Sequence, residues 1–313
     1  MIRFVLKRLL LMIPIVLGVS FIIFTILSFT PGDPASTILG SGALQSEIDA
    51  LNHELGYDRP FFYRYFKYIY DAFFRLDFGI SYMTKQPIAS TVLSKAPISL
   101  RVAFNAIACA AILGIPIGVL SAVRQYSLLD TIPTSISILF ASVPAFWLGL
   151  MLILVFAVKM HLFPTSGIET WKGYILPMFT LGIPYAAQQM RFTRSSMLET
   201  IRQDYIRTAR AKGQKESTII WLHAMKNALM PVITIIGVNF GALLGGAVVT
   251  ETLFTIPGLG SYIVNGIKQK DLPVVMGGTI LLAIMFSFVM LIVDLLYAFV
   301  DPRIKARYTK GGK

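Results

Sequence analysis

The sequence predicts an all-α polytopic membrane protein with six transmembrane helices and both termini in the cytoplasm. Of its 313 residues, 55% are hydrophobic and 14% are charged, whereas an ordinary soluble domain has about 25% charged residues. Six segments contain no Asp, Glu, Lys or Arg, and each is long enough to cross a hydrocarbon layer, which takes about 17 to 25 helical residues. None of these segments shows the alternation of apolar and polar residues that is typical of a barrel strand. We therefore expect each to be a helix, in which the backbone groups form hydrogen bonds with one another inside the lipid.

The predicted spans follow one another along the whole chain. They are residues 9–29, 102–123, 131–158, 173–190, 227–250 and 272–293. The first follows Arg3, Lys7 and Arg8, as the apolar core of a signal peptide does. Its 21 uncharged residues exceed the roughly 7 to 15 of a signal core, and no A-x-A cleavage site precedes the "PGDP" that begins at Pro31. We therefore expect a retained helix.

The distribution of charge predicts the orientation. With the N-terminus inside, the inner segments hold 17 Lys and Arg against 5 Asp and Glu, and the outer segments hold 11 against 10. An excess of basic residues on the inner side satisfies the positive-inside rule. The net charge of +12 is thus explained by loops beside an anionic leaflet, and nucleic acid is not needed to explain it. Cys109 is the only cysteine, so no internal disulfide forms.

The chain divides into four segments with no appended soluble domain. Residues 1–30 form an N-terminal cytoplasmic segment and the first span, and residues 31–97 form an extracytoplasmic loop. Residues 98–300 form a core of five helices, which includes a cytoplasmic loop at 191–226. Residues 301–313 form a cytoplasmic tail.

Both large outer loops have features of their own. In "FFYRYFKYIYDAFFRLDFG", residues 61–79, aromatic residues alternate with isolated charges. This pattern suits a helix lying in the membrane interface, or one packed against the outer ends of the spans. The second loop, 251–271, is partly apolar and is broken by Gly and Pro, which fits either a re-entrant, scoop-like element or a simple surface loop.

The spans contain residues that favour close packing and bending. Gly237, Gly241 and Gly245 are four residues apart, which places three bare backbone patches on one face of the fifth span and lets another helix approach. Prolines, each of which removes a helical hydrogen bond, also lie in the spans, and four of them are candidate points of bending. They are Pro14, Pro116, Pro144 and Pro184.

Catalytic chemistry is missing from the sequence. His53, His161 and His223 all lie in predicted loops, and the H-E-x-x-H and G-x-S-x-G motifs are absent. We therefore expect no enzyme, no metal site and no bound cofactor. The nucleotide motif G-x-x-x-x-G-K-[ST] is also absent, so any ATP must be bound by another polypeptide. Only Asp294 lies near a span interior, which gives an ion-coupled carrier weak support.

The inner loop 191–226 is longer than orientation alone requires. It carries eight Lys and Arg, and good helix formers are interrupted at Gly213. This pattern predicts a short helix, a turn, and a second helix that leads into the membrane. A solvated basic loop is the alternative, but about 36 residues of helical character favour a docking element.

This loop resembles that of a known family. Arg207-Thr208-Ala209, followed after three residues by Gly213, is similar to the "EAA" loop in permease subunits of ATP-binding-cassette (ABC) importers. Further matches extend over nearly the whole chain. They are "PGDP" (31–34), "LGYDRP" (55–60), "DFGIS" (77–81), "GIPIGVLSAV" (114–123), "RFTRSSMLE" (191–199), "DYIRTARAKG" (204–213) and "TETLFTIPGLG" (250–260).

The departures narrow the subfamily. The general motif has Glu-Ala-Ala where this chain has Arg-Thr-Ala, and its proline falls thirteen residues after the glycine, whereas Pro231 comes eighteen after Gly213. Both departures resemble the dipeptide, oligopeptide and nickel branch of binding-protein-dependent importers, in its first-permease, or B-type, subunit.

The resemblance implies a MetI-like permease fold and a coupling helix at about 207–219 that sits in a groove of a separate ATPase. The residues implied in coupling are Asp204, Tyr205, Arg207, Thr208, Ala209, Arg210, Ala211, Lys212 and Gly213. The implied partners are a second, related permease, two subunits that bind ATP and Mg²⁺, and an extracytoplasmic binding protein. The chain would form half of a pathway for di- or oligopeptides, or alternatively for chelated nickel or glutathione, in a bacterial or archaeal inner membrane.

Overall fold

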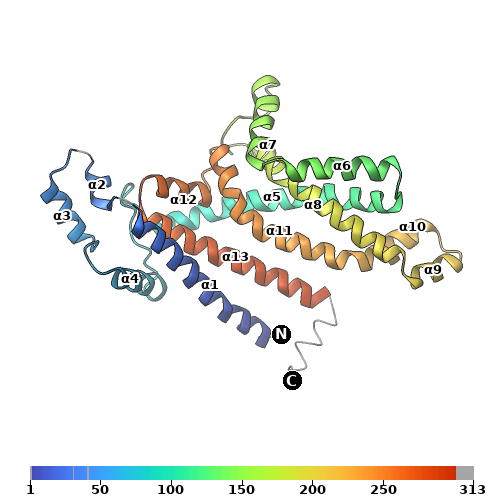
Figure 1. Ribbon diagram of the computed structural model, residues 1–313, viewed down its shortest axis with the longest axis horizontal. Coiled ribbons are helices and arrows are strands. Elements are labelled where there is room, and N and C mark those ends of the chain that lie inside the picture. Colours follow the sequence, from blue (N-terminus) through green and yellow to red (C-terminus); the bar gives the residue numbers. More distant parts are fainter. Residues whose placement is uncertain (1, 31, 41, 301–313) are drawn as a thin grey trace. The chain divides into compact units, whose positions relative to one another are not determined.

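The computed structural model describes residues 2–30, 32–40 and 42–300, and the predicted tail at 301–313 lies outside them. Their regular structure is helical, apart from an isolated bridge between Ile80 and Pro87 (Figure 1). The chain forms two compact units. Of the described residues, we call 2–4, Leu100–Ile256 and 288–300 the core unit, and Val5–Ser99 with Pro257–Ser287 the N-terminal unit.

Apolar helices occupy most of the predicted spans. Among the described residues, four helices are long and apolar enough to cross a membrane, or five if one bent pair counts as a single span. Three of these lie in α1 (Ile2–Phe29), α5 (Ile88–Val123) and α13 (Leu272–Val300), and the other runs from Glu216 to the end of α11 (Met225–Leu253). The predicted fourth span falls in α8 (Ile175–Ile201), which is not among them because Gln188, Gln189 and Arg191 lower its hydropathy.

The prediction of one continuous helix over 131–158 is wrong. The chain forms α6 (Leu128–Ser142), α7 (Ala145–Leu152) and the π-helix η1 (Ile153–Lys159), with a bend of 103° after α6. Val143 has φ −78° and ψ 127°, an extended conformation. A residue before proline is driven out of the α region by the proline ring, and Pro144 has no N–H to continue the helix. Pro144 therefore breaks the span instead of bending it slightly.

The core unit is built around α8, which packs against α6, α7 and α11. Two glycines of α5 also allow a close approach to α8. A Cβ on Gly114 would lie 2.7 Å from the Ala186 carbonyl oxygen, and one on Gly118 would lie 2.6 Å from that of Met190. Real Cβ atoms do not approach so closely, so only glycine permits this helix pair.

The glycines of α11 differ in their surroundings. A Cβ on Gly237 would lie 2.2 Å from Cγ1 of Val293 in α13, which is the close helix approach that the sequence predicts there. Gly241 is also buried. Gly245 is exposed, and no atom lies within 4 Å of the place a Cβ would occupy. Within the described chain, the packing face thus ends before Gly245.

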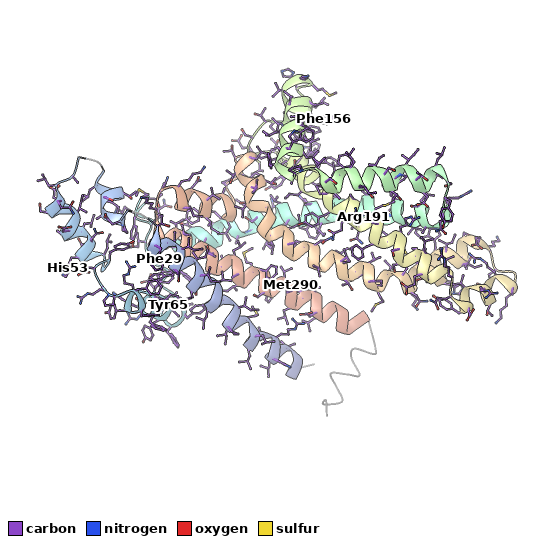
Figure 2. The ribbon with its side chains drawn as sticks, in the orientation of Figure 1. Phe29, His53, Tyr65, Phe156, Arg191 and Met290 are labelled. Atoms are coloured by element: carbon purple, nitrogen blue, oxygen red, sulfur yellow. The ribbon has the colours of Figure 1, made fainter. Side chains whose placement is uncertain are left out.

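The N-terminal unit contains four short helices: α2 (Pro34–Leu39), α3 (Gln45–Glu54), α4 (Phe61–Phe74) and α12 (Leu259–Lys268). The aromatic stretch is thus helical up to Phe74, and α4 packs against α1. Tyr65, labelled in Figure 2, lies 5.2 Å from Phe21 between ring centroids, and its hydroxyl contacts the Ser20 hydroxyl at 3.1 Å.

The predicted outer loop at 251–271 contains one helix, α12, which starts immediately after Gly258. Leu259 and Ile263 are buried in a core with Ile88, Val92, Val274 and Val275. The Leu259 backbone N–H donates to the Ser99 hydroxyl at 2.8 Å, so a side chain of α5 satisfies the first turn of α12. The segment 251–271 therefore contains a packed helix and is not a simple surface loop.

Candidate functional site

The predicted docking element contains a short separate helix, α9 (Asp204–Ala211), after the end of α8 at Ile201. The prediction of a single helix over 207–219 is wrong, because α9 ends at Ala211 and helix resumes only at α10 (Glu216–Thr218). The pattern of helix, turn and second helix is confirmed. The second helix continues through the π-helix η3 (Ile219–Ala224) into α11.

Gly213 is the reason that α9 stops where it does. Its φ is +76°, in the left-handed region that costs a residue with a Cβ about 1 to 2 kcal/mol. The Gly213 N–H donates to the Arg210 carbonyl at 2.9 Å, which satisfies one carbonyl of the last turn. A glycine just beyond the helix end is the usual way to make this reversal.

An ion pair closes the turn that follows. The Arg210 guanidinium donates from Nη2 to Oε1 of Glu216 at 2.6 Å and from Nε to Oε2 at 3.1 Å, across the five intervening residues. These hydrogen bonds raise the pKa of the Arg210 guanidinium, which therefore remains charged. Because both side chains are about half exposed, the pair shapes the turn without contributing much to stability.

A buried apolar cluster fixes α9 to the core unit. Ile206 is 0% exposed, whereas its neighbours Tyr205 and Arg207 face outward. Ile206 inserts into what we call the inner cluster, which draws on α5, α8, η3 and α11. Its members are Val119, Ala122, Met197, Ile206, Ile219, Ile220, Ala224, Met225 and Ala228. Movement of α9 must therefore move the ends of α8 and α11, or open this cluster.

The implied coupling residues lie on the other side of α9. All nine are exposed except Ala209, which is partly buried and packs against the inner cluster. Tyr205 is 44% exposed, and its hydroxyl accepts a hydrogen bond from Asn227 of α11 at 2.8 Å. The ion pair of Arg207 with Asp204, at 3.6 Å, is highly exposed and holds little together.

Ile206 is not among the residues that the family resemblance implies in coupling. The signal was present, because Ile206 and Ala209 are three residues apart in a mostly polar helix, and Ile206 is its one large aliphatic residue. Such spacing places both on one face. Residues 219 and 220, which complete the cluster, lie beyond the turn and cannot be paired with Ile206 from spacing alone.

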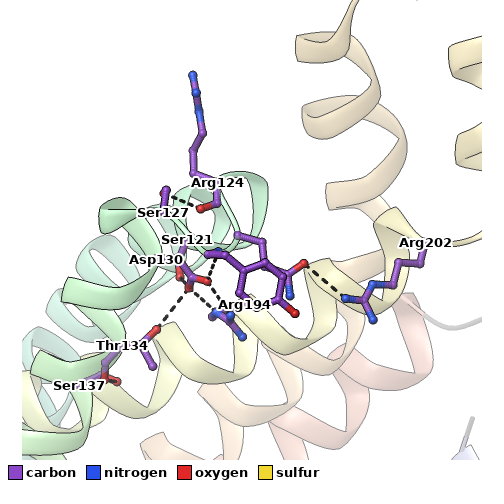
Figure 3. Close-up of polar contacts among 10 residues, drawn as sticks. Ser121, Arg124, Ser127, Asp130, Thr134, Ser137, Arg194 and Arg202 are labelled. Atoms are coloured by element: carbon purple, nitrogen blue, oxygen red, sulfur yellow. Dashed lines mark hydrogen bonds and ion pairs between the residues drawn. The ribbon is translucent and has the colours of Figure 1, made fainter.

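A buried carboxylate links α8 to the helices before it (Figure 3). Asp130 accepts hydrogen bonds from Nε and Nη2 of Arg194 at 2.5 and 2.7 Å. The same carboxylate accepts from the Ser121 hydroxyl of α5 and from the Tyr126 N–H in the turn between α5 and α6. The Asp130 side chain is 5% exposed and that of Arg194 is 25% exposed. Two charges that are largely out of water bind strongly only when doubly hydrogen-bonded in this way.

A basic groove lies beside α9. Its volume is about 530 Å³, and three of its lining side chains are Arg202, Arg207 and Arg210. Arg202 donates to Gln125 at 3.4 Å, which places the groove between α9 and the end of α5. The groove is open and cationic, so it suits a polar or acidic protein surface better than an apolar ligand. Among the residues that the structure describes, no group of three or more His, Cys, Asp or Glu is placed to hold a metal ion.

Family models match both parts of the chain. Residues 114–306 match the binding-protein-dependent transport system inner membrane component, and residues 1–103 match the N-terminal part of such membrane components. The glutathione transport system permease protein GsiC of Escherichia coli K12 is 38% identical over 305 residues, which cover 97% of this chain and 99% of that protein. GsiC of Shigella dysenteriae serotype 1 matches equally well.

Solved structures share the fold at low identity. An inward-facing form of the MetNI methionine ABC transporter matches with a TM-score of 0.54 and 19% identity, covering 68% of this chain and 97% of that chain. An amino acid ABC transporter matches with a TM-score of 0.52 and 14% identity, covering 68% and 94%. These likenesses confirm the MetI-like permease fold.

Proposed function

Because this chain belongs to the family of binding-protein-dependent inner-membrane permeases and is a permease subunit of an ABC importer, we propose that α9 is its ATPase-coupling helix and that small peptides are its cargo. Importers of this family work with an ATPase and a substrate-binding protein. We assign ATP and Mg²⁺ to the ATPase subunits, so that this chain performs no hydrolysis.

The burial of Ile206 carries the proposal. A helix of eight residues is too short to be stable alone, yet α9 is held by a side chain that is 0% exposed while its charged face is open. A helix fixed in this way transmits force to the elements it packs on. The inner cluster contains residues of α8 and α11, so a push on α9 reaches both helices.

The ion pair of Asp130 and Arg194 would transmit the movement of α8 to α5 and α6. Arg194 lies on α8, and its carboxylate partner is bonded to both neighbouring elements. Rotation of α8 would therefore carry the inner ends of α5 and α6 with it. The separate ATPase would supply the motion, and the groove beside α9 would receive part of its surface.

We propose a second, related permease as the partner across α11. Val238, Gly245 and Val249 are exposed on this helix, and no atom lies within 4 Å of the place a Cβ would occupy on Gly245. Small residues favour close helix approach in membranes. The unfilled part of the predicted glycine face would thus contact another subunit, and the two permeases together would enclose the pathway.

The cargo proposal rests on the relatives. GsiC is a glutathione permease, and glutathione is a peptide-like solute, so this chain would import glutathione or small peptides, with chelated nickel as the alternative cargo. The location would be a bacterial or archaeal inner membrane, with the N-terminus and α9 in the cytoplasm. The ion-coupled carrier has no support from the family match.

The decisive experiment is cross-linking from α9. Cys109 is buried and is the single native cysteine, so Cys109→Ala gives a clean background. Thr208→Cys, on the exposed face of α9, should form an adduct with the ATPase subunit when this thiol in the assembled transporter is labelled with a maleimide that carries a photoactivatable benzophenone and the sample is illuminated. Arg124→Cys, exposed but outside α9, is the control for thiol accessibility.

A thiol at position 208 that reacts with monofunctional maleimide, but that never forms an adduct with the ATPase, would contradict the docking assignment. Cargo is tested separately, by ATP-dependent uptake of labelled glutathione into proteoliposomes. Competition by other tripeptides would extend the proposed cargo from glutathione to small peptides in general. Competition by a nickel chelate alone would identify chelated nickel as the cargo.

A further inference from the structure

A second cavity lies in the N-terminal unit, and none of its lining residues belongs to the proposed coupling helix or the inner cluster. Its volume is about 320 Å³, at the lower end of the roughly 300 to 1,000 Å³ of small-molecule sites. Its walls come from the end of α3 and the turn after it, from α4, and from Phe24 and Tyr82. The family resemblance assigns no residue of this cavity to a function.

The two faces of α4 show which solvent the cavity meets. Phe62, Phe66 and Phe73 lie on one side of this helix and are 62%, 64% and 40% exposed, which suits the membrane interface. Arg64 and Asp71 lie on the opposite side of the helix by its repeat, and both line the cavity. The cavity is therefore on the aqueous side of α4, where a dissolved ligand can reach it.

Two buried polar atoms in the cavity wall have no hydrogen-bond partner among the described residues. They are the Tyr68 hydroxyl and Nε of Arg64. A buried donor without an acceptor costs about 1 to 3 kcal/mol, so such atoms need an explanation. Burial raises the pKa of Tyr68, and it raises that of Tyr82 to about 12, so both hydroxyls keep their protons.

Arg64 is held in place as a ligand-binding group would be. Its Nη1 donates to the Tyr57 carbonyl and its Nη2 to the Ser28 hydroxyl, both at 3.2 Å. Its guanidinium lies over the Tyr57 ring, 4.2 Å from the centroid. This stacking on an aromatic face fixes the plane of the guanidinium. Nε is the guanidinium nitrogen that makes no hydrogen bond among the described residues.

The lining of the cavity holds three basic side chains against two acidic ones, Glu54 and Asp71. Asp71 lines it but is bound by Arg75 at 3.1 Å. No carboxylate of the described residues lies within ion-pair distance of Arg59, Arg64 or Lys67, and Glu54 is the other acid in the wall. Three cations and four tyrosines thus line the same space.

We propose that this cavity is a binding site for the carboxylate of a small water-soluble ligand, bound by the hydroxyl of Tyr68 and the guanidinium of Arg64 between tyrosine rings. A carboxylate supplies the acceptors that the two donors lack, and charge-assisted hydrogen bonds are the stronger ones. Lys67 attracts the anion from the exposed edge. This site is separate from the coupling helix and does not depend on the proposed ATPase docking.

The test uses N-acetyl-Ala-Ala and its C-terminal amide as probes. The assembled transporter is placed in phosphatidylcholine nanodiscs without nucleotide, and binding is measured by calorimetry. Tyr68→Phe removes only the hydroxyl, and it should weaken binding of the acid about tenfold, the loss expected for one charge-assisted hydrogen bond. Tyr65→Phe, which removes a bonded hydroxyl of the same helix, is the matched control and should leave the affinity unchanged.

Lys67→Gln should weaken binding about threefold and reduce its salt dependence. Equal binding of acid and amide, or equal affinity of the wild type and Tyr68→Phe, would overturn the proposal, as would no binding at any soluble concentration. Repeating the titration in discs containing phosphatidylglycerol identifies the source of the anion. Unchanged affinity supports a soluble ligand, whereas loss of the signal would assign the cavity to a lipid headgroup. Cross-linking from α9 stays informative in every case.

Discussion

Two short amphipathic helices of this permease, α9 and α4, bury one stripe each and expose opposite chemistry. α9 buries Ile206 and presents charged residues, whereas α4 buries Tyr65 and Ala72 and presents aromatic rings. The buried stripe fixes where each helix lies, and the exposed face determines what the helix meets. A charged face suits another protein in water, and an aromatic face suits a membrane interface.

The two helices also differ in how they are anchored. α9 depends on the inner cluster and, through α8, on the buried pair of Asp130 and Arg194. α4 depends on aromatic contacts with α1 and on the Tyr65 hydroxyl. Loss of a charge from a buried pair is expensive, and loss of one hydroxyl is not. Substitutions near α9 should therefore have the larger effects.

The largest effect is expected for Arg194→Ala, which leaves the Asp130 carboxylate buried without its cation. The free energy of unfolding should fall by about 3 to 4 kcal/mol, and ATP-driven uptake should be lost. Thermal unfolding in detergent and uptake into proteoliposomes measure the two effects. The double variant Asp130→Ala/Arg194→Ala should recover part of the stability, and a double variant less stable than the single one would contradict a paired role.

Ile206→Ala should have the second-largest effect, because it removes the apolar side chain that anchors α9. We expect a loss of about 2 to 3 kcal/mol and ATP hydrolysis that no longer drives uptake. The ratio of transported solute to hydrolysed ATP is the measurement. Ile206→Val keeps most of the volume and should transport almost normally, whereas normal coupling in Ile206→Ala would remove the anchor from the mechanism.

Gly213→Ala should cost about 1 to 2 kcal/mol, because the new side chain must adopt a positive φ. No atom lies within 4 Å of its Cβ position, so the cost is conformational and not steric. Gly213→Asn should be milder, since asparagine tolerates this region. Gly213→Pro cannot adopt a positive φ and should uncouple uptake from hydrolysis while the protein still inserts. Equal stability of the Ala and Asn variants would show that the turn rearranges freely.

Tyr65→Phe tests how α4 is anchored, for comparison with α9, and should have the smallest effect of these substitutions. It removes hydrogen bonds to the Ser20 hydroxyl and the Leu17 carbonyl, both at 3.1 Å, but keeps the ring contacts. The free energy of unfolding should fall by about 1 kcal/mol, with uptake unchanged. A loss as large as that of Ile206→Ala would mean that α4, too, carries force.

The family and the positions of most helices could be predicted from the sequence alone. Uncharged runs locate α1, α5, α11 and α13 because lipid excludes charge and unpaired backbone groups. The break at Gly213 was visible as well, because only glycine adopts that conformation cheaply. Pro144 was recognised as a weak point, but whether a proline bends a helix or ends it depends on the packing around it.

Contacts between distant segments were beyond the sequence. Ile206 meets Ile219 and Val119 only after the turn and three helices are in place. Arg194 finds Asp130 across 64 residues, and nothing in either local pattern selects the other. Periodicity determined which face of each helix is buried, because that face follows from the helical repeat. The tertiary structure decided what each face is buried against, because hydrogen bonds and close packing depend on distances that a linear pattern does not contain.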